Sequence, residues 1–360
     1  MTSEKVRVGI LSTAAIAGKV LPGLKHGMEV VGVASRDRAK AEEFCREHDC
    51  GIGMLYDELI EREDVDVLYI PLPTGLRNER ISKAIASGKH IYSEKPMGGT
   101  VAELKALLKA CEEKGLQWMD GTMWYHSTRT KEIERKLRGG ELGSVLRVSA
   151  TFTFMAPDEA WLHGGNGRTD KSREPMGCLG DQGWYPLSAI LWAYGWIMPE
   201  KVVCTHVTLN RVDTIVACAG TLWFPGGRSA VFDCGVTSPH RSQYEIVCEK
   251  GTIRVDDLVG GQKRTGNFTA YELPFVGSGE YVQGDVMGKD EVMCPEACDH
   301  VNMLVDDLAS CIRTIKGGGK PDPDWPRRSL LVHTVMTAVF ESAQTGGVAV
   351  DLSKTGHGYA

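Results

Sequence analysis

The chain has 360 residues, of which 42% are hydrophobic and 24% are charged, and its formal net charge is −6 at pH 7. This composition is ordinary for a globular enzyme, and the length favours two domains. The acidic balance and the lack of a Lys/Arg-rich stripe argue against a protein that binds nucleic acid.

The amino-terminal stretch MTSEKVRVGIL has no basic segment followed by an apolar core and a cleavage site, so it does not resemble a signal peptide. No apolar run approaches the length that spans a bilayer. We therefore expect a cytoplasmic protein that does not enter membranes.

The 11 cysteines are scattered along the chain. Without an export signal, reduced thiols are expected instead of disulfides. Cys294, Cys298 and His300 come closest to a metal motif, but a structural zinc site would bring a second close pair of ligands. We therefore expect free thiols and no metal.

The first third of the chain alternates strand and helix patterns at short spacing. Strands are predicted at Val6–Leu11, Glu29–Ala34, Asp66–Pro71, His90–Glu94 and Gln117–Asp120. Helices are predicted at Ala15–Lys25, Asp37–His48 and Thr130–Leu137. One further helix follows the third strand and ends at about Ser87, and another begins at Thr100. Asp37 is placed to cap its helix, and Thr100 with Glu103 forms a capping box. This alternation predicts a doubly wound parallel sheet, a Rossmann domain over residues 1–125.

After about residue 144 the pattern changes to a run of strands. They are predicted at Val145–Phe154, Lys201–Asn210, Thr214–Phe224, Ser229–Cys234, Tyr244–Cys248 and Thr252–Val255, with helices over about 299–316 and 328–344. Residues 126–360 are therefore predicted to form an α+β domain on an open, mainly antiparallel sheet. The segments 155–178 and 257–297 have no pattern that places them.

The first strand–turn–helix reads VGILSTAAIAGKV. The three small positions of a dinucleotide-binding turn fall on Ser12, Ala14 and Ala17 instead of on glycines. Alanine still allows close packing, and Ser12 and Thr13 offer hydroxyl groups beside a helix N-terminus, which favours phosphate. Small residues at such a contact occur in any α/β fold, but we predict that Ser12, Thr13, Ala14 and Ile16 contact a dinucleotide.

The second strand ends in VASRD, which bears on the choice of cofactor. A carboxylate at this point favours NAD, whereas the 2′-phosphate of NADP needs a cation. Ser35 and Arg36 stand at the strand end, and Asp37 has a separate role as a helix cap. We therefore predict NADP over NAD, bound by Ser35 and Arg36; the alternative is a solvated arginine.

The stretch IYSEKPMGG, residues 91–99, places Glu94 and Lys95 at the carboxyl edge of the parallel sheet, where ligands of such folds bind. GKHIYSEKP, preceded by DVDVLYIPLPTGLRNE and followed by GTMWYHS, resembles the Gfo/Idh/MocA family of nicotinamide-dependent oxidoreductases. GDQGWY, residues 180–185, fits the family's second signature. The likeness extends over nearly the whole chain.

The resemblance implies that Glu94 contacts the nicotinamide-side ribose and that Lys95 reaches the substrate oxygen. It implies further cofactor contacts at Pro71, Leu72, Thr74 and Trp124. If its segment is helical, Asp181 lies one turn before Tyr185, where many family members carry an acid/base histidine. A tyrosine at that position resembles the subgroup of dihydrodiol dehydrogenases and aldose or ketose oxidoreductases.

A free tyrosine has a pKa of roughly 10, and a neighbouring ammonium favours its phenolate. We predict Tyr185 as proton donor and acceptor, with Lys95 stabilising charge on oxygen and Asp181 as a third catalytic residue; the reverse roles of Lys95 and Tyr185 remain open. Substrate contacts are predicted at Tyr125, His126, Trp161, Asn166 and Arg168, each of which could instead serve packing. Arg77 stands where many family members have histidine.

The leading hypothesis is an NADP-dependent oxidoreductase acting on a secondary alcohol, ketone or aldose of a sugar-like or diol substrate. Two alternatives are a dinucleotide-binding sensor without turnover, and a redox-neutral, glycosidase-like enzyme with tightly held NAD. Family members commonly pair through the C-terminal sheet, and TIVACAGTLWF and RSAVFDCGV have apolar residues on both faces. We therefore predict a homodimer formed through that sheet.

Overall fold

The computed structural model describes residues 5–259, 268–272, 289–292 and 300–353. They divide into two compact units, each treated by itself below. Unit 1 comprises Met1–Met123, Ser172–Glu174 and His300–His333, and unit 2 comprises Trp124–Lys171, Pro175–Asp299 and Thr334–Ala360. Unlike the single cut predicted at residue 125, this division assigns two later segments of the chain to unit 1.

Unit 1 contains a six-stranded parallel sheet with the strand order β3-β2-β1-β4-β5-β6. The strands are β1 (Arg7–Ile10), β2 (Glu29–Ser35), β3 (Ile52–Leu55), β4 (Val67–Ile70), β5 (His90–Ser93) and β6 (Trp118–Asp120). This is the doubly wound order, so the predicted Rossmann fold is confirmed. Sequence reasoning missed β3, a four-residue strand exposed at both ends.

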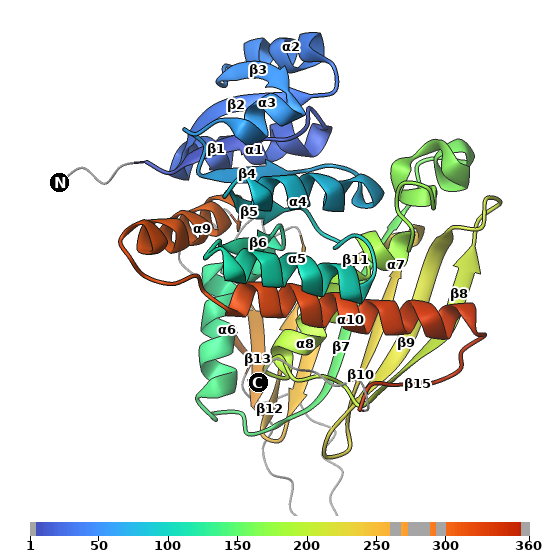
Figure 1. Cartoon of the computed structure of the whole chain (residues 1–360). Coiled ribbons are helices and arrows are strands. Elements are labelled where there is room, and N and C mark those ends of the chain that lie inside the picture. Colours follow the sequence, from blue (N-terminus) through green and yellow to red (C-terminus); the bar gives the residue numbers. More distant parts are fainter. Residues whose placement is uncertain (1–4, 260–267, 273–288, 293–299, 354–360) are drawn as a thin grey trace, which may run out of the picture. The chain divides into compact units, whose positions relative to one another are not determined.

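The helices of unit 1 follow the strands (Figure 1). They are α1 (Ala15–Gly27), α2 (Arg38–His48), α3 (Tyr56–Glu61), α4 (Arg77–Ala86), α5 (Val101–Glu113), α9 (His300–Lys316) and the first half of α10 (Asp324–Gln344). The two predicted caps are confirmed. Asp37 accepts a hydrogen bond from the Ala39 N–H at 3.0 Å, and Thr100 and Glu103 form a capping box.

Helix α9 packs on α1, which explains why a late segment belongs to unit 1. A Cβ atom built on Gly23 would lie 2.4 Å from Val301 Cγ1, and one on Gly27 would lie 2.7 Å from Val305 Cγ1. The two glycines, one turn apart, let the helices approach closely, and Val305 lies in the apolar core of unit 1. Spacing along the chain alone does not reveal this pairing.

Unit 2 contains a nine-stranded sheet with the order β14-β13-β12-β11-β7-β10-β9-β8-β15. The strands are β7 (Val145–Met155), β8 (Lys201–Leu209), β9 (Ile215–Phe224), β10 (Arg228–Gly235), β11 (Thr237–Cys248), β12 (Gly251–Val255), β13 (Phe268–Glu272), β14 (Lys289–Val292) and β15 (Val350–Asp351). Only the β7–β10 pair is parallel among these strands, so the predicted mainly antiparallel sheet is confirmed.

Helices of unit 2 cover one face of this sheet (Figure 1). They include α7 (Cys178–Asp181) and α8 (Trp184–Ala193), which pack on β7, β9, β10 and β11, while α6 (Thr128–Arg138) precedes β7. Every residue of α8 is buried, so its mostly apolar composition suits a helix enclosed by the sheet and its neighbours.

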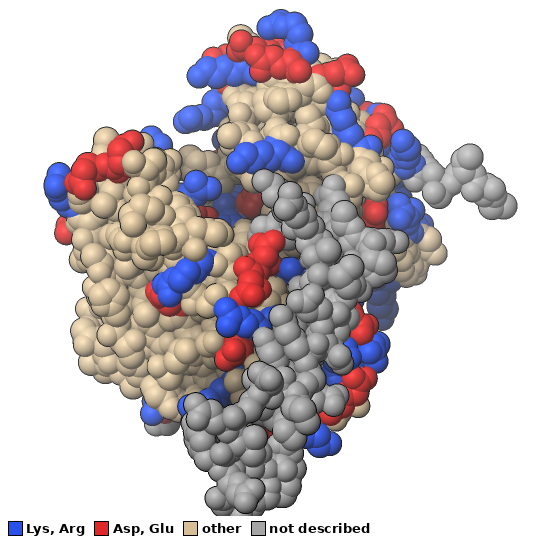
Figure 2. All heavy atoms as spheres, turned by 180° about the vertical axis from the view of Figure 1, so that it is seen from behind, with Lys and Arg blue, Asp and Glu red and all other residues tan. Residues whose placement is uncertain are grey.

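The opposite face of the sheet has few charged side chains over β8–β10, as Figure 2 shows. Val231 is 49% exposed there and lies between Ser149 of β7 and Thr221 of β9. The face therefore presents mainly small and apolar groups to the solvent, with Asp233 of β10 paired with Arg241 of β11.

In the part of the chain that the structure describes, no helix combines the length and the apolar character that crossing a membrane requires. The cysteines described there carry free thiols, and most are buried. Cys294 and Cys298, of the weak metal motif, lie outside the described residues.

Candidate functional site

The β1–α1 turn lies beside the strand-order switch between β1 and β4. The Leu11 N–H donates to the Tyr69 carbonyl at 2.8 Å, and the Ser12 hydroxyl accepts from the Ala14 N–H at 3.0 Å. Ala17 is fully buried, so alanine meets the packing demand of the third small position. Helix α1 has no side-chain cap at Ala14, which leaves its first-turn N–H groups suited to an anion. The turn thus fits a phosphate group without glycines.

The end of β2 carries two arginines with different surroundings. Arg38 forms an ion pair with Glu58, whereas Arg36 is exposed and has no hydrogen bond or ion pair with any residue that the structure describes. Ser35 is buried, and its hydroxyl accepts from the Asp37 N–H at 3.3 Å. Arg36 is therefore the cation at this strand end that remains available for a phosphate.

Glu94 follows β5 as a buried carboxyl group. It accepts a hydrogen bond from the Tyr69 hydroxyl at 2.7 Å. Burial raises its pKa, while the Tyr69 hydrogen bond and the nearby charges of Lys95 and Arg77 oppose the rise. Lys95 is half-buried, and its peptide bond to Pro96 is cis. The strand end therefore holds an acceptor and an ammonium side by side.

Gly121, directly after β6, makes room for this carboxyl group. A Cβ atom at position 121 would lie 2.9 Å from Glu94 Oε2 and 3.0 Å from Oε1. Any larger residue would displace the carboxylate. Sequence reasoning did not single out this glycine, although its place just after a predicted strand is a signal of close approach.

Arg77 has a structural role that the sequence left open. Its side chain is buried and donates to the Leu72 carbonyl at 2.9 and 3.1 Å, to the Pro96 carbonyl at 2.5 Å and to the Glu94 carbonyl. Burial lowers its pKa, and the nearby carboxylate of Glu94 opposes this. Arg77 thus ties the loop after β4 to the loop after β5.

The loop after β4 contains three of the predicted cofactor residues. Pro71, Leu72 and Thr74 are all buried. The Thr74 hydroxyl donates to Glu174 Oε2 at 2.7 Å, and Glu174 is itself 6% exposed. Glu174, which sequence reasoning missed, therefore braces this loop. The Thr74 hydroxyl donates its proton in the hydrogen bond to Glu174, so it can only accept a hydrogen bond from a ligand.

In unit 2, the GDQGWY segment is helical, which meets the condition for Asp181 and Tyr185 to lie one turn apart. Asp181 ends α7, Tyr185 lies in α8, and Gln182 and Gly183 between them keep helical backbone angles. Asp181 Oδ2 forms an ion pair with Arg168 Nε at 2.6 Å and accepts from Gln182 Nε2 at 2.5 Å. The structure therefore brings the predicted catalytic Asp181 together with the predicted substrate residue Arg168.

Gly183 explains why this segment can lie so close to the sheet. A Cβ atom on Gly183 would lie 3.1 Å from the Cys234 Sγ of β10 and 2.4 Å from the Leu179 carbonyl oxygen. The glycine of the second signature therefore serves packing.

Tyr185 lies at one end of a row of aromatic rings. Its ring is 5.4 Å from Phe152, Phe152 is 6.2 Å from Phe154, and Phe154 is 6.0 Å from Trp161. Sequence reasoning missed the two phenylalanines, although alternate positions of one strand point to one face. Aromatic rings beside polar groups suit a polyhydroxylated or diol ligand.

Trp124, Tyr125 and His126 are buried, and the roles predicted for them stay predictions. Trp124 is 1% exposed, lies 4.5 Å from the Tyr125 ring and 5.3 Å from that of Trp192, and donates to Ser188 Oγ at 3.3 Å. Tyr125 and His126 are 7% and 1% exposed. The Trp124 ring is therefore packed within unit 2, and its predicted contact with the cofactor stays a prediction.

Of the remaining predicted residues, Ile16 lies in α1, and the three substrate residues lie in one irregular loop before α7. Trp161 begins a short π-helical segment (Trp161–Gly165) and is half-buried, while Ile16 in unit 1 is half-buried on the core. The Asn166 side chain accepts from the Arg168 N–H at 3.0 Å and starts the turn Gly167–Thr169. Trp161, Asn166 and Arg168 thus belong to one structural piece.

Two family models match the chain. The model of an oxidoreductase family with an NAD-binding Rossmann fold, GFO_IDH_MocA, matches residues 6–122. The GFO/IDH/MocA C-terminal domain model matches residues 130–254.

Individual proteins are similar over most of the chain. A dTDP-3,4-didehydro-2,6-dideoxy-alpha-D-glucose 3-reductase of Saccharopolyspora spinosa is 32% identical over 70% of this chain and 75% of its own. A D-xylose 1-dehydrogenase (NADP(+)) of Haloferax volcanii is 27% identical over 96% and 99%. The crystal structure of an aldose-aldose oxidoreductase from Caulobacter crescentus is similar with a TM-score of 0.81 at 22% identity, over 97% and 100% of the two chains, which supports the fold.

Proposed function

The chain belongs to the GFO/IDH/MocA family of oxidoreductases, and on that premise we propose that it transfers hydride between NADP and a secondary alcohol, ketone or aldose of a sugar-like or diol substrate. The observation that carries the proposal is the Glu94–Lys95 pair at the carboxyl edge of a doubly wound sheet, where such folds bind ligands. The relatives named above act on sugars by their names, which supports the substrate class.

The residues of unit 1 fit the parts of the cofactor. The uncapped start of α1 with Ser12 and Thr13 suits the pyrophosphate, and Glu94 suits a ribose hydroxyl. Arg36, with Ser35 beside it, would hold the 2′-phosphate of NADP because its guanidinium has no other partner among the described residues. NADP as the cofactor of the Haloferax volcanii relative supports this choice.

The bound cofactor would supply or accept the hydride. Lys95 would stabilise the charge on the substrate oxygen through its ammonium group, and the Tyr185 hydroxyl would give or take the proton. Asp181, fixed by Arg168 and Gln182, would orient the polar groups of the substrate. In the reverse assignment, Lys95 would be the proton donor and Tyr185 would stabilise the charge.

The experiment that tests the proposal is a fluorescence titration of the purified protein with NADPH and with NADH. Loss of a charge-assisted hydrogen bond costs about 1.5–3 kcal/mol, so Arg36→Ala should weaken NADPH binding about tenfold to a hundredfold and leave NADH unchanged. Arg38→Ala is the matched control, because Arg38 is already paired with Glu58. Equal loss in both variants would overturn the role of Arg36.

Turnover then separates this function from the alternatives. D-xylose and a trans-dihydrodiol, each with NADP, are the first substrates to try. Cofactor binding without turnover of any sugar or diol would favour the sensor, and tightly co-purifying NAD would favour the redox-neutral enzyme.

We also propose a cytoplasmic homodimer that pairs through the free face of the unit 2 sheet. The exposed side chain of Val231 and the low number of charges over β8–β10 support this interface. Sedimentation of Val231→Asp, compared with the wild-type protein, tests it, and a monomeric wild type at micromolar concentration would overturn it.

A further inference from the structure

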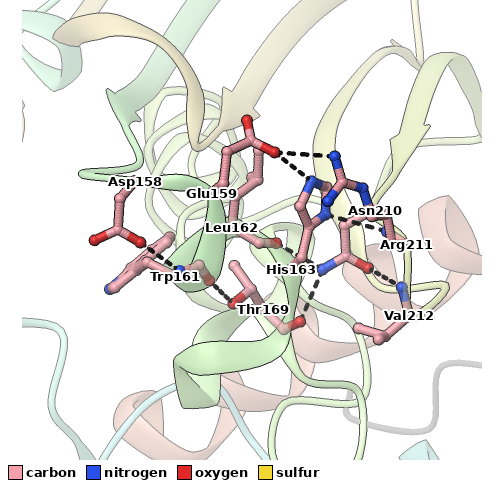
Figure 3. Close-up of polar contacts among 9 residues, drawn as sticks. All are labelled: Asp158, Glu159, Trp161, Leu162, His163, Thr169, Asn210, Arg211 and Val212. Carbon is pink, nitrogen blue, oxygen red and sulfur yellow. Dashed lines mark hydrogen bonds and ion pairs between the residues drawn. The ribbon is translucent and has the colours of Figure 1, made fainter.

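Asn210, the residue after β8, uses its side chain for four hydrogen bonds. Figure 3 shows the bonds to Leu162, Thr169 and Val212. Its Nδ2 group donates to the Leu162 carbonyl at 2.8 Å and to the Thr169 carbonyl at 2.9 Å. Its Oδ1 atom accepts from the Val212 N–H at 3.0 Å and from the Thr214 N–H at 2.9 Å. The residue is 7% exposed, so both ends of the amide are buried and satisfied.

The two donated bonds hold both ends of one loop. Leu162 and Thr169 bracket Asn166 and Arg168, and the Thr169 hydroxyl donates to the Trp161 carbonyl at 2.5 Å. One amide group from a turn about 40 residues further along the chain therefore fixes the segment that carries Trp161, Asn166 and Arg168.

The loop needs such a support because its own backbone is irregular. His163 has φ −108° and ψ 40°, and Gly164 has φ 102°, so neither continues the helical segment that starts at Trp161. Backbone carbonyls in such a segment need partners from outside it. Asn210 supplies donors to two of them.

A second set of contacts links the same loop and turn at the surface. His163 Nε2 lies 3.1 Å from Glu159 Oε2, Arg211 Nη2 donates to the same oxygen at 3.1 Å, and the Arg211 N–H donates to His163 Nδ1 at 3.2 Å (Figure 3). The Glu159 and Arg211 side chains are 73% and 74% exposed. Exposed ion pairs contribute little, so the buried amide of Asn210 is the main support.

We propose that Asn210 is a positioning residue for substrate binding, acting through the loop Trp161–Thr169. The proposal rests on the proposed function, in which Trp161, Asn166 and Arg168 contact the substrate. The loop also determines where the Arg168 guanidinium stands, and Arg168 Nε is 2.6 Å from Asp181 Oδ2. Loosening the loop should therefore weaken substrate binding and leave the cofactor and the proton-transferring groups unchanged.

Asn210→Asp separates the two halves of the amide. Its carboxylate still accepts from the Val212 and Thr214 N–H groups, so the turn is kept, but it donates no bond to Leu162 or Thr169. Arg211→Ala is the matched control, because it removes an exposed contact from the same turn. Thr169→Val, which loses the hydroxyl bond to Trp161, is a second variant that tests the same loop from the other side.

The measurements are steady-state kinetics with D-xylose and NADP, NADPH affinity, and the rate of tryptic cleavage after Arg168, whose side chain is 54% exposed. For Asn210→Asp we expect KM for D-xylose to rise about tenfold to a hundredfold, kcat and the NADPH Kd to stay near wild type, and cleavage to accelerate at least as much. Thr169→Val should show a smaller change in the same direction, and Arg211→Ala almost none.

Wild-type KM and cleavage rate in a folded Asn210→Asp protein would overturn the proposal. A fall in kcat and NADPH affinity together with an unchanged KM would also overturn it, because that result indicates general damage. If the wild-type protein turns over no D-xylose, the sugar substrate is wrong, and the tryptic cleavage rate then decides by itself whether Asn210 holds the loop.

Discussion

The two candidate regions are held in place in different ways. In unit 1, Glu94 follows directly from a central strand and is bonded by Tyr69 of the neighbouring strand. In unit 2, Arg168 lies on an irregular loop whose shape depends on Asn210. The first region is part of a strand end of the unit 1 sheet, whereas the second is a loop held by side-chain hydrogen bonds.

The difference teaches which part of such a site tolerates change. Strand ends are fixed by the ladder of the whole sheet, so a cofactor common to many enzymes can be bound there with little adjustment. A loop held by a few side-chain bonds can change with the substrate and leave the fold intact. We therefore expect variants in unit 1 to affect cofactor binding and stability, and variants of the unit 2 loop to affect substrate choice.

The largest effect should come from the proposed proton donor. Tyr185→Phe removes the proton donor, and loss of general acid/base catalysis should lower kcat by about 100- to 10,000-fold with NADPH binding unchanged. Tyr194→Phe is the control, because its hydroxyl bonds only the Ser229 and Leu146 carbonyls of the sheet among the described residues. Pre-steady-state turnover measures the effect, and a kcat within a few-fold of wild type in Tyr185→Phe would assign the proton to Lys95.

Arg77 tests how strongly the strand-end region is braced. Arg77→Met leaves the buried carbonyls of Leu72, Glu94 and Pro96 without their donor, which should lower the free energy of unfolding by about 3 kcal/mol or more. Arg80→Met, on the same helix, removes partly exposed contacts with Asp57, Glu79 and the Tyr56 ring and should cost about 1 kcal/mol or less. Urea unfolding measures both, and equal losses would contradict the bracing role.

A smaller effect is expected on the stability of the folded state at acidic pH. Burial lowers the pKa of His90 to about 4, and its Nδ1 accepts from the Gln117 N–H at 2.9 Å, so the folded state requires the neutral ring. This contribution to stability is present above about pH 6.5 and is lost as the pH falls toward 4, on the order of 3 kcal/mol in total. His333, with a pKa also lowered to about 4, adds a loss over the same range.

His90→Asn should therefore flatten the dependence of the unfolding free energy on pH between 6.5 and 4, since asparagine accepts a hydrogen bond but does not titrate. His26→Asn is the control, because that side chain is 55% exposed. The free energy of unfolding is measured by chemical unfolding at several pH values. Hydrogen exchange then shows whether the loss of stability lies in unit 1. If the unfolding free energy of His90→Asn depends on pH as steeply as that of the wild type, His90 does not cause the loss of stability in acid.

Much of unit 1 was predictable from local patterns. The strands β1, β2 and β4 contain apolar runs, and the caps at Asp37 and Thr100 mark their helices directly. Lys201–Asn210 was predicted as one strand, but it ends at Leu209 because Asn210 bonds the turn that follows. A polar residue at the end of a strand pattern does not reveal whether it pairs or turns.

The sequence by itself determined the family, the order of the two kinds of sheet and the positions of Glu94, Lys95 and Tyr185, because these depend on motifs of neighbouring residues. Only the tertiary structure decided that Arg77 braces two loops, that Trp124 is enclosed and that Asn210 holds the loop carrying Arg168. The physical reason is that a hydrogen bond depends on distance in space, and the chain between its partners carries no periodic signal of their approach.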